Sequence, residues 1–189
     1  MKHAEQGDAT AQFDLGVMYA KGEGVPKDLA KTAAWFQKAA AQGNATAQLM
    51  LGLMYNEGEG IPRDLAKAVE WYQKAAAQGY ASAQYTLGGL YAKGEGVPKD
   101  ATKAVELWQK AAAQGDTSAQ HNLGIMYATG EGVPKDKVFA YAWINLAASG
   151  GDKGSVELRG IVERGMSAAE IAEAQRLSSS WKKGELLAR

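Results

Sequence analysis

Cysteine is absent from this chain of 189 residues. The absence excludes disulfide bonds and thiolate chemistry, so the fold must be held together by packing alone. A chain of this length is compatible with one large domain or with a short array of repeats. The lack of cysteine does not identify the compartment in which the protein works.

An excess of charge of either sign is also missing. The 21 lysine and arginine residues balance the 21 aspartate and glutamate residues, which leaves a formal net charge of zero. A neutral chain has no overall field that would attract nucleic acid or an anionic membrane. We therefore expect no nucleic-acid partner.

Long apolar runs are missing as well. The most apolar piece, residues 139–148, falls short of the roughly 18 residues that a membrane-spanning helix needs. The first eight residues lack the apolar core of a signal peptide. We therefore expect no membrane span. The localisation stays open between the cytoplasm and, after removal of a signal from a longer precursor, the periplasm or the exterior.

The chain instead contains an internal repeat of 36 residues. Three residue types recur at this interval: Gly16, Gly52, Gly88 and Gly124; Tyr19, Tyr55, Tyr91 and Tyr127; and Pro26, Pro62, Pro98 and Pro134. A fixed period of roughly 20–50 residues is typical of repeat arrays. We predict a single domain, residues 1–189, with repeats at 8–43, 44–79, 80–115 and 116–151, a partial preceding unit at 1–7 and C-terminal capping helices at 152–189.

Each repeat has the pattern of two helices. Apolar residues at helical spacing predict the first helix over residues 9–20, and Asp8 is placed to accept a hydrogen bond from its first turn. Gly16 lies within the apolar stripe, where glycine costs roughly 1 kcal/mol relative to alanine. Because this glycine recurs in every repeat, we predict that two helices approach each other closely there.

A connector with two glycines and a proline leads to the second helix. We predict this helix over residues 29–42, with Asp28 as its N-cap and Gly43 as a left-handed C-cap. Such a helix pair cannot bury its apolar face alone, so neighbouring repeats must stack. A buried amide without a partner costs about 1–3 kcal/mol. We therefore predict hydrogen bonds to the neighbouring repeat or loop from the recurrent glutamines, Gln12, Gln48, Gln84 and Gln120.

The fourth repeat departs from this pattern. Recurrent lysines of its second helix become Phe139 and Leu146, so this helix needs further cover. Residues 152–164 have the pattern of a helix, and the capping-box sequence Ser167–Glu170 predicts the start of another. We predict that these two helices form a C-terminal cap and that residues 182–189 fray.

The pattern A-Q-x-x-L-G-x-M-Y-x-x-G-E-G-[VI]-P-[KR]-D, followed by W-[FY]-Q-K-A-A-A-Q-G, resembles the Sel1-like repeat, a relative of the tetratricopeptide repeat with a longer loop. Four units match over residues 9–151, and the C-terminal ending resembles the caps of bacterial members. The resemblance implies an all-α fold, a right-handed superhelical α/α solenoid with a concave groove, and a role as a non-enzymatic adaptor or scaffold. Leu107 departs from the pattern by replacing a tryptophan, and we expect the adjacent Trp108 to fill its space.

The residues that vary between the first helices lie on one helical face. In the tetratricopeptide repeat this face lines the groove, so the resemblance implies a strip of apolar residues and a few charges that binds a protein or peptide partner. The predicted site residues are Phe13, Val17, Lys21, Leu49, Leu53, Asn56, Glu57, Tyr85, Lys93, His121, Ile125 and Thr129. The alternative is that Phe13, Leu49 and Ile125 pack between adjacent repeats.

Residues that could carry chemistry are few. His3 and His121 are the only histidines, with no cysteine and no second histidine at ligand spacing, so we predict no metal site and no cofactor. No nucleophile recurs beside them, so we predict no catalytic residue and no enzyme. A cell-wall-associated enzyme and, less favoured, a helical-repeat RNA binder with a basic groove stay as alternatives. The open edge of the first helix pair also permits end-to-end self-association.

Overall fold

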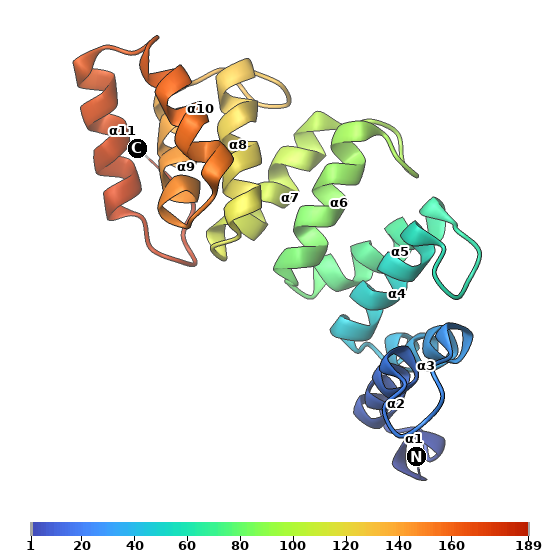
Figure 1. Ribbon diagram of the computed structural model, residues 1–189. Coiled ribbons are helices and arrows are strands. Elements are labelled where there is room, and N and C mark those ends of the chain that lie inside the picture. Colours follow the sequence, from blue (N-terminus) through green and yellow to red (C-terminus); the bar gives the residue numbers. More distant parts are fainter. Residues whose placement is uncertain (1, 189) are drawn as a thin grey trace. The chain divides into compact units, whose positions relative to one another are not determined.

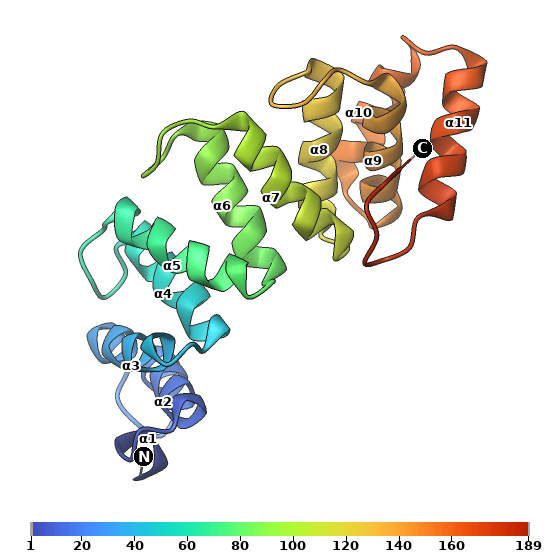
Figure 2. The same ribbon diagram turned by 180° about the vertical axis from the view of Figure 1, so that it is seen from behind.

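The structure, a computed structural model, describes residues 2–188 and consists over that range of eleven helices without a strand (Figures 1 and 2). Contacts divide the chain into two compact units. The first contains the chain up to Ala83 together with Glu95–Val97, and the second contains Gln84–Gly94 and the chain from Pro98 onward. The predicted all-α architecture of paired helices is confirmed.

In the first unit, each predicted repeat forms two helices. α2 packs against α3 and α4 packs against α5, while α3 also packs against α4, so the second helix of one repeat contacts the first helix of the next. A short helix, α1, packs against α2. The helices are α1 (Lys2–Glu5), α2 (Ala9–Lys21), α3 (Leu29–Ala41), α4 (Ala45–Glu57) and α5 (Leu65–Ala77).

The second unit continues the same pattern and ends in the cap. α8 packs against α7 and α9, and α9 packs against both α10 and α11. α6 belongs to this unit from Gln84 onward. The helices are α6 (Ala81–Lys93), α7 (Ala101–Ala113), α8 (Thr117–Thr129), α9 (Lys137–Ser149), α10 (Lys153–Glu163) and α11 (Ala168–Ser180).

The helix boundaries follow from the predicted caps. Asp8 Oδ1 accepts a hydrogen bond from the Ala11 amide at 2.6 Å, and Asp28 Oδ1 accepts one from the Lys31 amide at 2.9 Å. The same role is played by Asn44, Asp64, Asp100, Asp116 and Asp136. Gly43 has a φ of 90°, the left-handed conformation predicted for the residue that ends the second helix. The predicted caps are confirmed.

The recurrent mid-helix glycine allows each first helix to approach its second helix closely. A side chain on Gly16 would begin 2.6 Å from the buried ring of Phe36. The equivalent pairs are Gly52 with Tyr72, Gly88 with Trp108, and Gly124 with Ile144. The predicted close approach is confirmed. The prediction for Trp108 is wrong, because this ring takes the place of Phe36 and not the space that Leu107 leaves.

Buried glutamines join neighbouring repeats, as predicted. Gln12 Nε2 donates to the Ala4 carbonyl of α1 at 3.2 Å, and Gln12 Oε1 accepts from Gln42 Nε2 at 2.8 Å. Gln48 Nε2 and Gln120 Nε2 likewise donate to the carbonyls of Ala40 and Ala112 in the preceding repeat. The pairing of Gln12 with Gln42 lies within one repeat, and it recurs between Gln48 and Gln78 and between Gln84 and Gln114. Each pairing satisfies a buried amide, whose desolvation would otherwise oppose folding.

The second helix of the fourth repeat, α9, is covered by the predicted capping helices. Both α10 and α11 pack against it. Phe139 stacks on Tyr127 with the ring centroids 5.3 Å apart, whereas in the first repeat the Lys31 ammonium lies over Tyr19. The fourth repeat therefore replaces a cation–π contact by an apolar aromatic contact.

The C-terminal segment differs in part from the prediction. Ser167 and Glu170 form the predicted capping box of α11. The prediction that the C-terminal residues fray is wrong for residues 182–188, because the Gly184 N–H donates to the Ala113 carbonyl of α7 at 2.7 Å. Residue 189 lies outside the described part of the chain. A backbone hydrogen bond from a distant helix end therefore holds this segment in place.

Candidate functional site

The predicted site residues fall into two groups, one on each compact unit. In the first unit α2 carries Phe13, Val17 and Lys21, and α4 carries Leu49, Leu53, Asn56 and Glu57. Lys21 and Glu57 are exposed and the other five residues are half-buried. Every member of this group therefore keeps accessible surface.

Part of this strip also stabilises the stacking of repeats. The ring of Phe13 stacks on Phe36 with centroids 5.2 Å apart and an interplanar angle of 19°. Phe13 and Val17 pack against the core cluster that contains Ala47 and Leu51 of α4. Packing between repeats, which was the alternative for Phe13, thus accounts for the buried part of this side chain. Whether its accessible part binds a partner stays a prediction.

In the second unit, the predicted residues have more varied surroundings. Tyr85 is half-buried, and its backbone carbonyl accepts a hydrogen bond from Trp108 Nε1 at 3.1 Å. Ile125 is 36% exposed, and its carbonyl accepts a hydrogen bond from the Thr129 hydroxyl at 3.0 Å. Lys93 is exposed at the end of α6. Ile125 and Lys93 therefore offer an apolar and a charged contact on this unit.

His121 is engaged by the cap. Its Nδ1 lies 2.8 Å from Ser155 Oγ and 3.3 Å from Asp152 Oδ1, at the start of α10. These residue types also form hydrolase triads, but there the histidine contacts serine and aspartate through different ring nitrogens. Ser155 is fully buried, and its amide N–H donates to Asp152 Oδ1 at 2.6 Å. The arrangement therefore joins α8 to α10 and lacks the geometry that would activate a nucleophile.

Sequence reasoning missed this junction, although the repeat interval contains the signal. Asp152 follows Asp116 by 36 residues, and Ser155 follows Ala119 by the same interval. α10 is therefore in register with the first helices of the repeats. Ala119 and Ser155 are both fully buried. One further step of the interval would have predicted Ser155 as a buried position of this helix, although not its contact with His121.

Asp152 makes this junction sensitive to acid. Hydrogen bonds from the Ser155 side chain and then its backbone, together with nearby His121, hold the pKa of the Asp152 carboxyl below its ordinary value of 3.8. Because the folded-state pKa is the lower one, this stabilisation is complete above the unfolded-state pKa and is lost as the pH falls through the folded-state pKa. We expect Asp152→Asn, which keeps an N-cap but not the charge, to lower the free energy of unfolding at neutral pH by about 0.5 kcal/mol, since water screens this site.

Urea unfolding of wild type and Asp152→Asn, followed by circular dichroism at neutral and at acidic pH, measures this effect. The two proteins should converge in stability in acid. Asp14→Asn, on an exposed position of α2, is the control and should match wild type at both pH values. A difference that is undiminished in acid would contradict the assigned role of the Asp152 charge.

The inner side of α4 is lined by Tyr72, whose ring packs against Gly52. Tyr72 is fully buried, and its hydroxyl has no hydrogen-bond partner within residues 2–188. Burial and, to a smaller extent, the Glu57 carboxylate raise the pKa of the Tyr72 hydroxyl, so this group stays neutral. Leu49 and Leu53 are therefore carried by a helix that rests on an uncharged aromatic ring.

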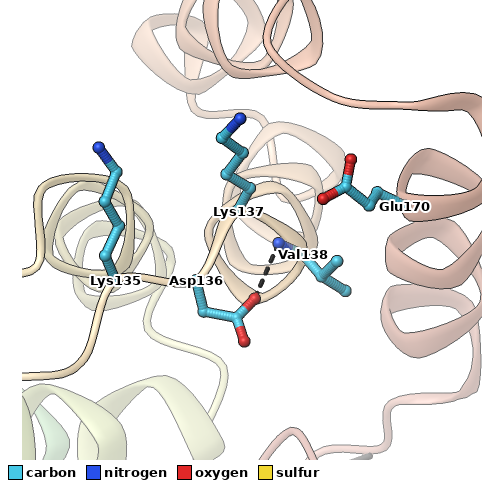
Figure 3. A pocket seen from close by; sticks show the side chains of 5 residues that line it. All are labelled: Lys135, Asp136, Lys137, Val138 and Glu170. Carbon is cyan, nitrogen blue, oxygen red and sulfur yellow. Dashed lines mark hydrogen bonds between the residues drawn. The ribbon is translucent and has the colours of Figure 1, made fainter.

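An open pocket at the N-terminus of α9 is lined by Lys135, Asp136, Lys137, Val138 and Glu170 (Figure 3). Asp136 Oδ1 accepts a hydrogen bond from the Val138 amide at 2.9 Å, and Glu170 belongs to the capping box of α11. The Lys137 ammonium donates to the Gly165 carbonyl. The carboxylates of Asp136 and Glu170 therefore serve to begin α9 and α11, and the Lys137 ammonium serves to hold the cap.

Within residues 2–188, no three or more His, Asp or Glu side chains gather where they could hold a metal ion. Over the same residues, no helix is long and apolar enough to cross a membrane. The first-helix faces offer apolar contacts, amides and charges, which are the groups that recognise peptides.

Comparison with protein families identifies one match. The model described as Sel1 repeat matches four consecutive segments, residues 9–44, 45–80, 81–116 and 117–152. These segments follow the predicted repeats with a shift of one residue. A search of curated proteins found no match to the chain.

Several solved structures are similar. A protective antigen present in uropathogenic Escherichia coli strains, which displays an SLR fold, is 36% identical with a TM-score of 0.84, and the match covers 93% of this chain and 39% of the antigen. A Sel1 repeat protein from Oxalobacter formigenes is 34% identical with a TM-score of 0.81, over 94% of this chain and 75% of that protein. Cysteine rich protein B from Helicobacter pylori is 26% identical with a TM-score of 0.55, over 70% and 95%. This chain therefore spans well under half of the E. coli antigen.

Proposed function

Because the chain belongs to the Sel1 repeat family, whose members generally act as protein-interaction scaffolds, we propose that it binds a segment of a partner protein on the faces of its first helices. The observation that supports this function is a strip of half-buried apolar residues at equivalent positions of α2 and α4, namely Phe13, Val17, Leu49 and Leu53. The same helices contribute Leu15 and Leu51 to the buried interior, so the strip lies on helices that are already fixed by the core.

The chemistry of the strip suits an amphipathic helix or an extended peptide. Apolar contacts with the leucines would contribute affinity, and the exposed charges of Lys21 and Glu57 would select the register of the bound segment. The resemblance to groove-forming repeats supports the same face. No cluster within residues 2–188 offers comparable support for an enzyme or an RNA binder, so we propose a single function.

The test compares partner binding by wild type and by a Leu49→Asp, Leu53→Asp double variant. The partner is first identified by co-purification from the native host and mass spectrometry, and its affinity is then measured with purified proteins. A carboxylate at an apolar contact must be desolvated on binding, so we expect the dissociation constant to rise roughly tenfold or more.

The matched control is an Ala34→Asp, Ala66→Asp double variant. It adds the same charge at exposed positions of the second helices α3 and α5. We expect it to bind like wild type, and circular dichroism checks that both variants remain helical. Undiminished binding by the folded leucine variant would show that the partner uses another surface.

A further inference from the structure

The side chain of His121, a predicted site residue on α8, uses one of its two ring nitrogens within the protein. Nδ1 lies 2.8 Å from Ser155 Oγ and 3.3 Å from Asp152 Oδ1. Nε2 makes no hydrogen bond to residues 2–188. It is not enclosed either, because among these residues only the Tyr72 hydroxyl is both buried and without a partner. The side chain keeps 25% of its surface exposed, so Nε2 stays accessible.

The surroundings of Nδ1 determine which nitrogen of the neutral ring carries the proton. An ionised carboxylate only accepts hydrogen bonds, and a serine hydroxyl has a single hydrogen to donate. The Asp152 carboxylate takes that hydrogen, since a hydrogen bond from the Ser155 side chain is the first cause that lowers the pKa of Asp152. Both oxygens near Nδ1 are therefore acceptors. A lone pair on Nδ1 would face them, so the proton lies on Nδ1 and the lone pair on Nε2.

The two acceptors are themselves fixed by the start of α10. Ser155 is fully buried, and its amide N–H donates to Asp152 Oδ1, the N-cap oxygen, at 2.6 Å. The ring of His121 is thus tied to a helix start and not to a mobile side chain. The hydrogen bond made by one ring nitrogen sets the state of the other. The capping helix therefore presents the Nε2 lone pair in a defined place.

We propose that the cap holds His121 as the Nδ1–H tautomer, and that its Nε2 is a hydrogen-bond acceptor for an N–H group of the bound partner segment. This inference rests on the proposed function and adds the chemistry that the fourth repeat selects. At the equivalent positions of α2 and α4, Phe13 and Leu49 offer apolar surface alone. The acceptor is therefore a feature of α8 that the first two repeats lack.

The acceptor also favours one conformation of the partner segment. In the free protein, water can bond to Nε2, and a segment that covers the ring must supply a donor in place of that water. A main-chain N–H is available in an extended segment, whereas in a helix it is used internally beyond the first turn. We therefore infer that the segment bound at His121 is extended and not an amphipathic helix.

Proton–nitrogen correlation NMR of the nitrogen-labelled full chain tests the tautomer, because a ring nitrogen with a proton resonates far from one without. The internal reference is His3, which is exposed on α1 and whose ring makes no hydrogen bond within residues 2–188. We expect the proton on Nδ1 in His121 and mainly on Nε2 in His3. A proton on Nε2 of His121 would overturn the proposal.

An Asp152→Asn, Ser155→Ala double variant tests whether the cap causes this state. It removes the charge and the hydroxyl while keeping an N-cap, and alanine fits because Ala119 is equally buried at the equivalent repeat position. We expect the His121 signals of this variant to move toward the His3 pattern. Signals that stay as in wild type would contradict the role of the cap.

The acceptor role is tested with the partner purified from the native host. Unlabelled partner should shift the Nε2 signal of His121 and leave that of His3 in place. We expect His121→Phe to raise the dissociation constant roughly tenfold, since a donor of the partner would be left without an acceptor. His3→Phe, the same replacement on α1, should bind like wild type. Circular dichroism checks the fold, and His121→Leu replaces His121→Phe if helicity is lost.

The outcomes separate this inference from the proposed function. An unchanged Nε2 signal in the saturated complex, or wild-type affinity of a folded His121 variant, would overturn the acceptor role. If the Leu49→Asp, Leu53→Asp variant still weakens binding in that case, the proposed function stands and this inference alone fails. If the leucine variant binds like wild type, the proposed function fails, whereas the free protein still decides the tautomer.

Discussion

Replacing Gly60 by alanine should destabilise the first unit by about 3 kcal/mol. Gly60 lies in the connector between α4 and α5 with a φ of 73°, and a Cβ there would collide with the carbonyl of Leu29 at the start of α3. Two costs add. A left-handed backbone costs a residue other than glycine about 1–2 kcal/mol, and displacing the start of the preceding repeat's helix costs about 1–3 kcal/mol. Urea unfolding followed by circular dichroism measures the loss.

The matched control for this variant is Gly43→Ala. Gly43 has a φ of 90°, but nothing lies within 4 Å of a Cβ built on it. This variant should therefore show the backbone cost alone, about 1–2 kcal/mol. Equal losses for the two variants would contradict the conclusion that the connector packs tightly against the preceding repeat.

Replacing Gly52 by alanine should lower the free energy of unfolding by about 1–2 kcal/mol, although alanine is the better helix former. The new Cβ would lie 2.7 Å from Cε1 and 2.8 Å from Cδ1 of Tyr72. Tyr72 is fully buried, so its ring can move away only by displacing the protein atoms that enclose it. The overpacking cost of about 1–3 kcal/mol therefore exceeds the gain in helix propensity. Urea unfolding again provides the measurement.

Gly89→Ala is the control for helix propensity. Gly89 also lies within a first helix, but a Cβ there would meet nothing within 4 Å. We expect this variant to raise the free energy of unfolding by about 0.5–1 kcal/mol. The two substitutions should thus have opposite signs. A stabilising effect of Gly52→Ala would mean that α4 and α5 can move apart without a cost in free energy.

The local features of the fold could be predicted because each depends on a few neighbouring residues. A carboxylate three residues before an amide, as in Asp28 and Lys31, is enough to begin a helix. The recurrence of Gly16 then predicted close packing, although the identity of its partner, Phe36, required the register between two helices. The error for Trp108 arose at this step, because adjacent positions of a helix face different neighbours.

The candidate site shows the same limit. Variation between repeats indicated the face that carries Phe13, Ile125 and His121. It did not indicate how much of each side chain packs within the protein and how much stays accessible. Phe13 stacks on a ring of the second helix, and His121 contacts Ser155, 34 residues further along the chain. Ile125 keeps 36% of its surface exposed. These differences depend on residues that are distant in sequence.

By itself, the sequence determined the helices and their caps, because hydrogen bonds and backbone preferences within one turn specify them, and its recurrent residues gave the period of 36 residues. Only the tertiary structure decided that Ser155 pairs with His121 and that Leu187 docks while its neighbour Leu186 stays accessible. The physical reason is that adjacent leucines have the same local propensities. Their different burial depends on the direction that the chain takes at Gly184 and on the apolar surface that α9 and α11 form together.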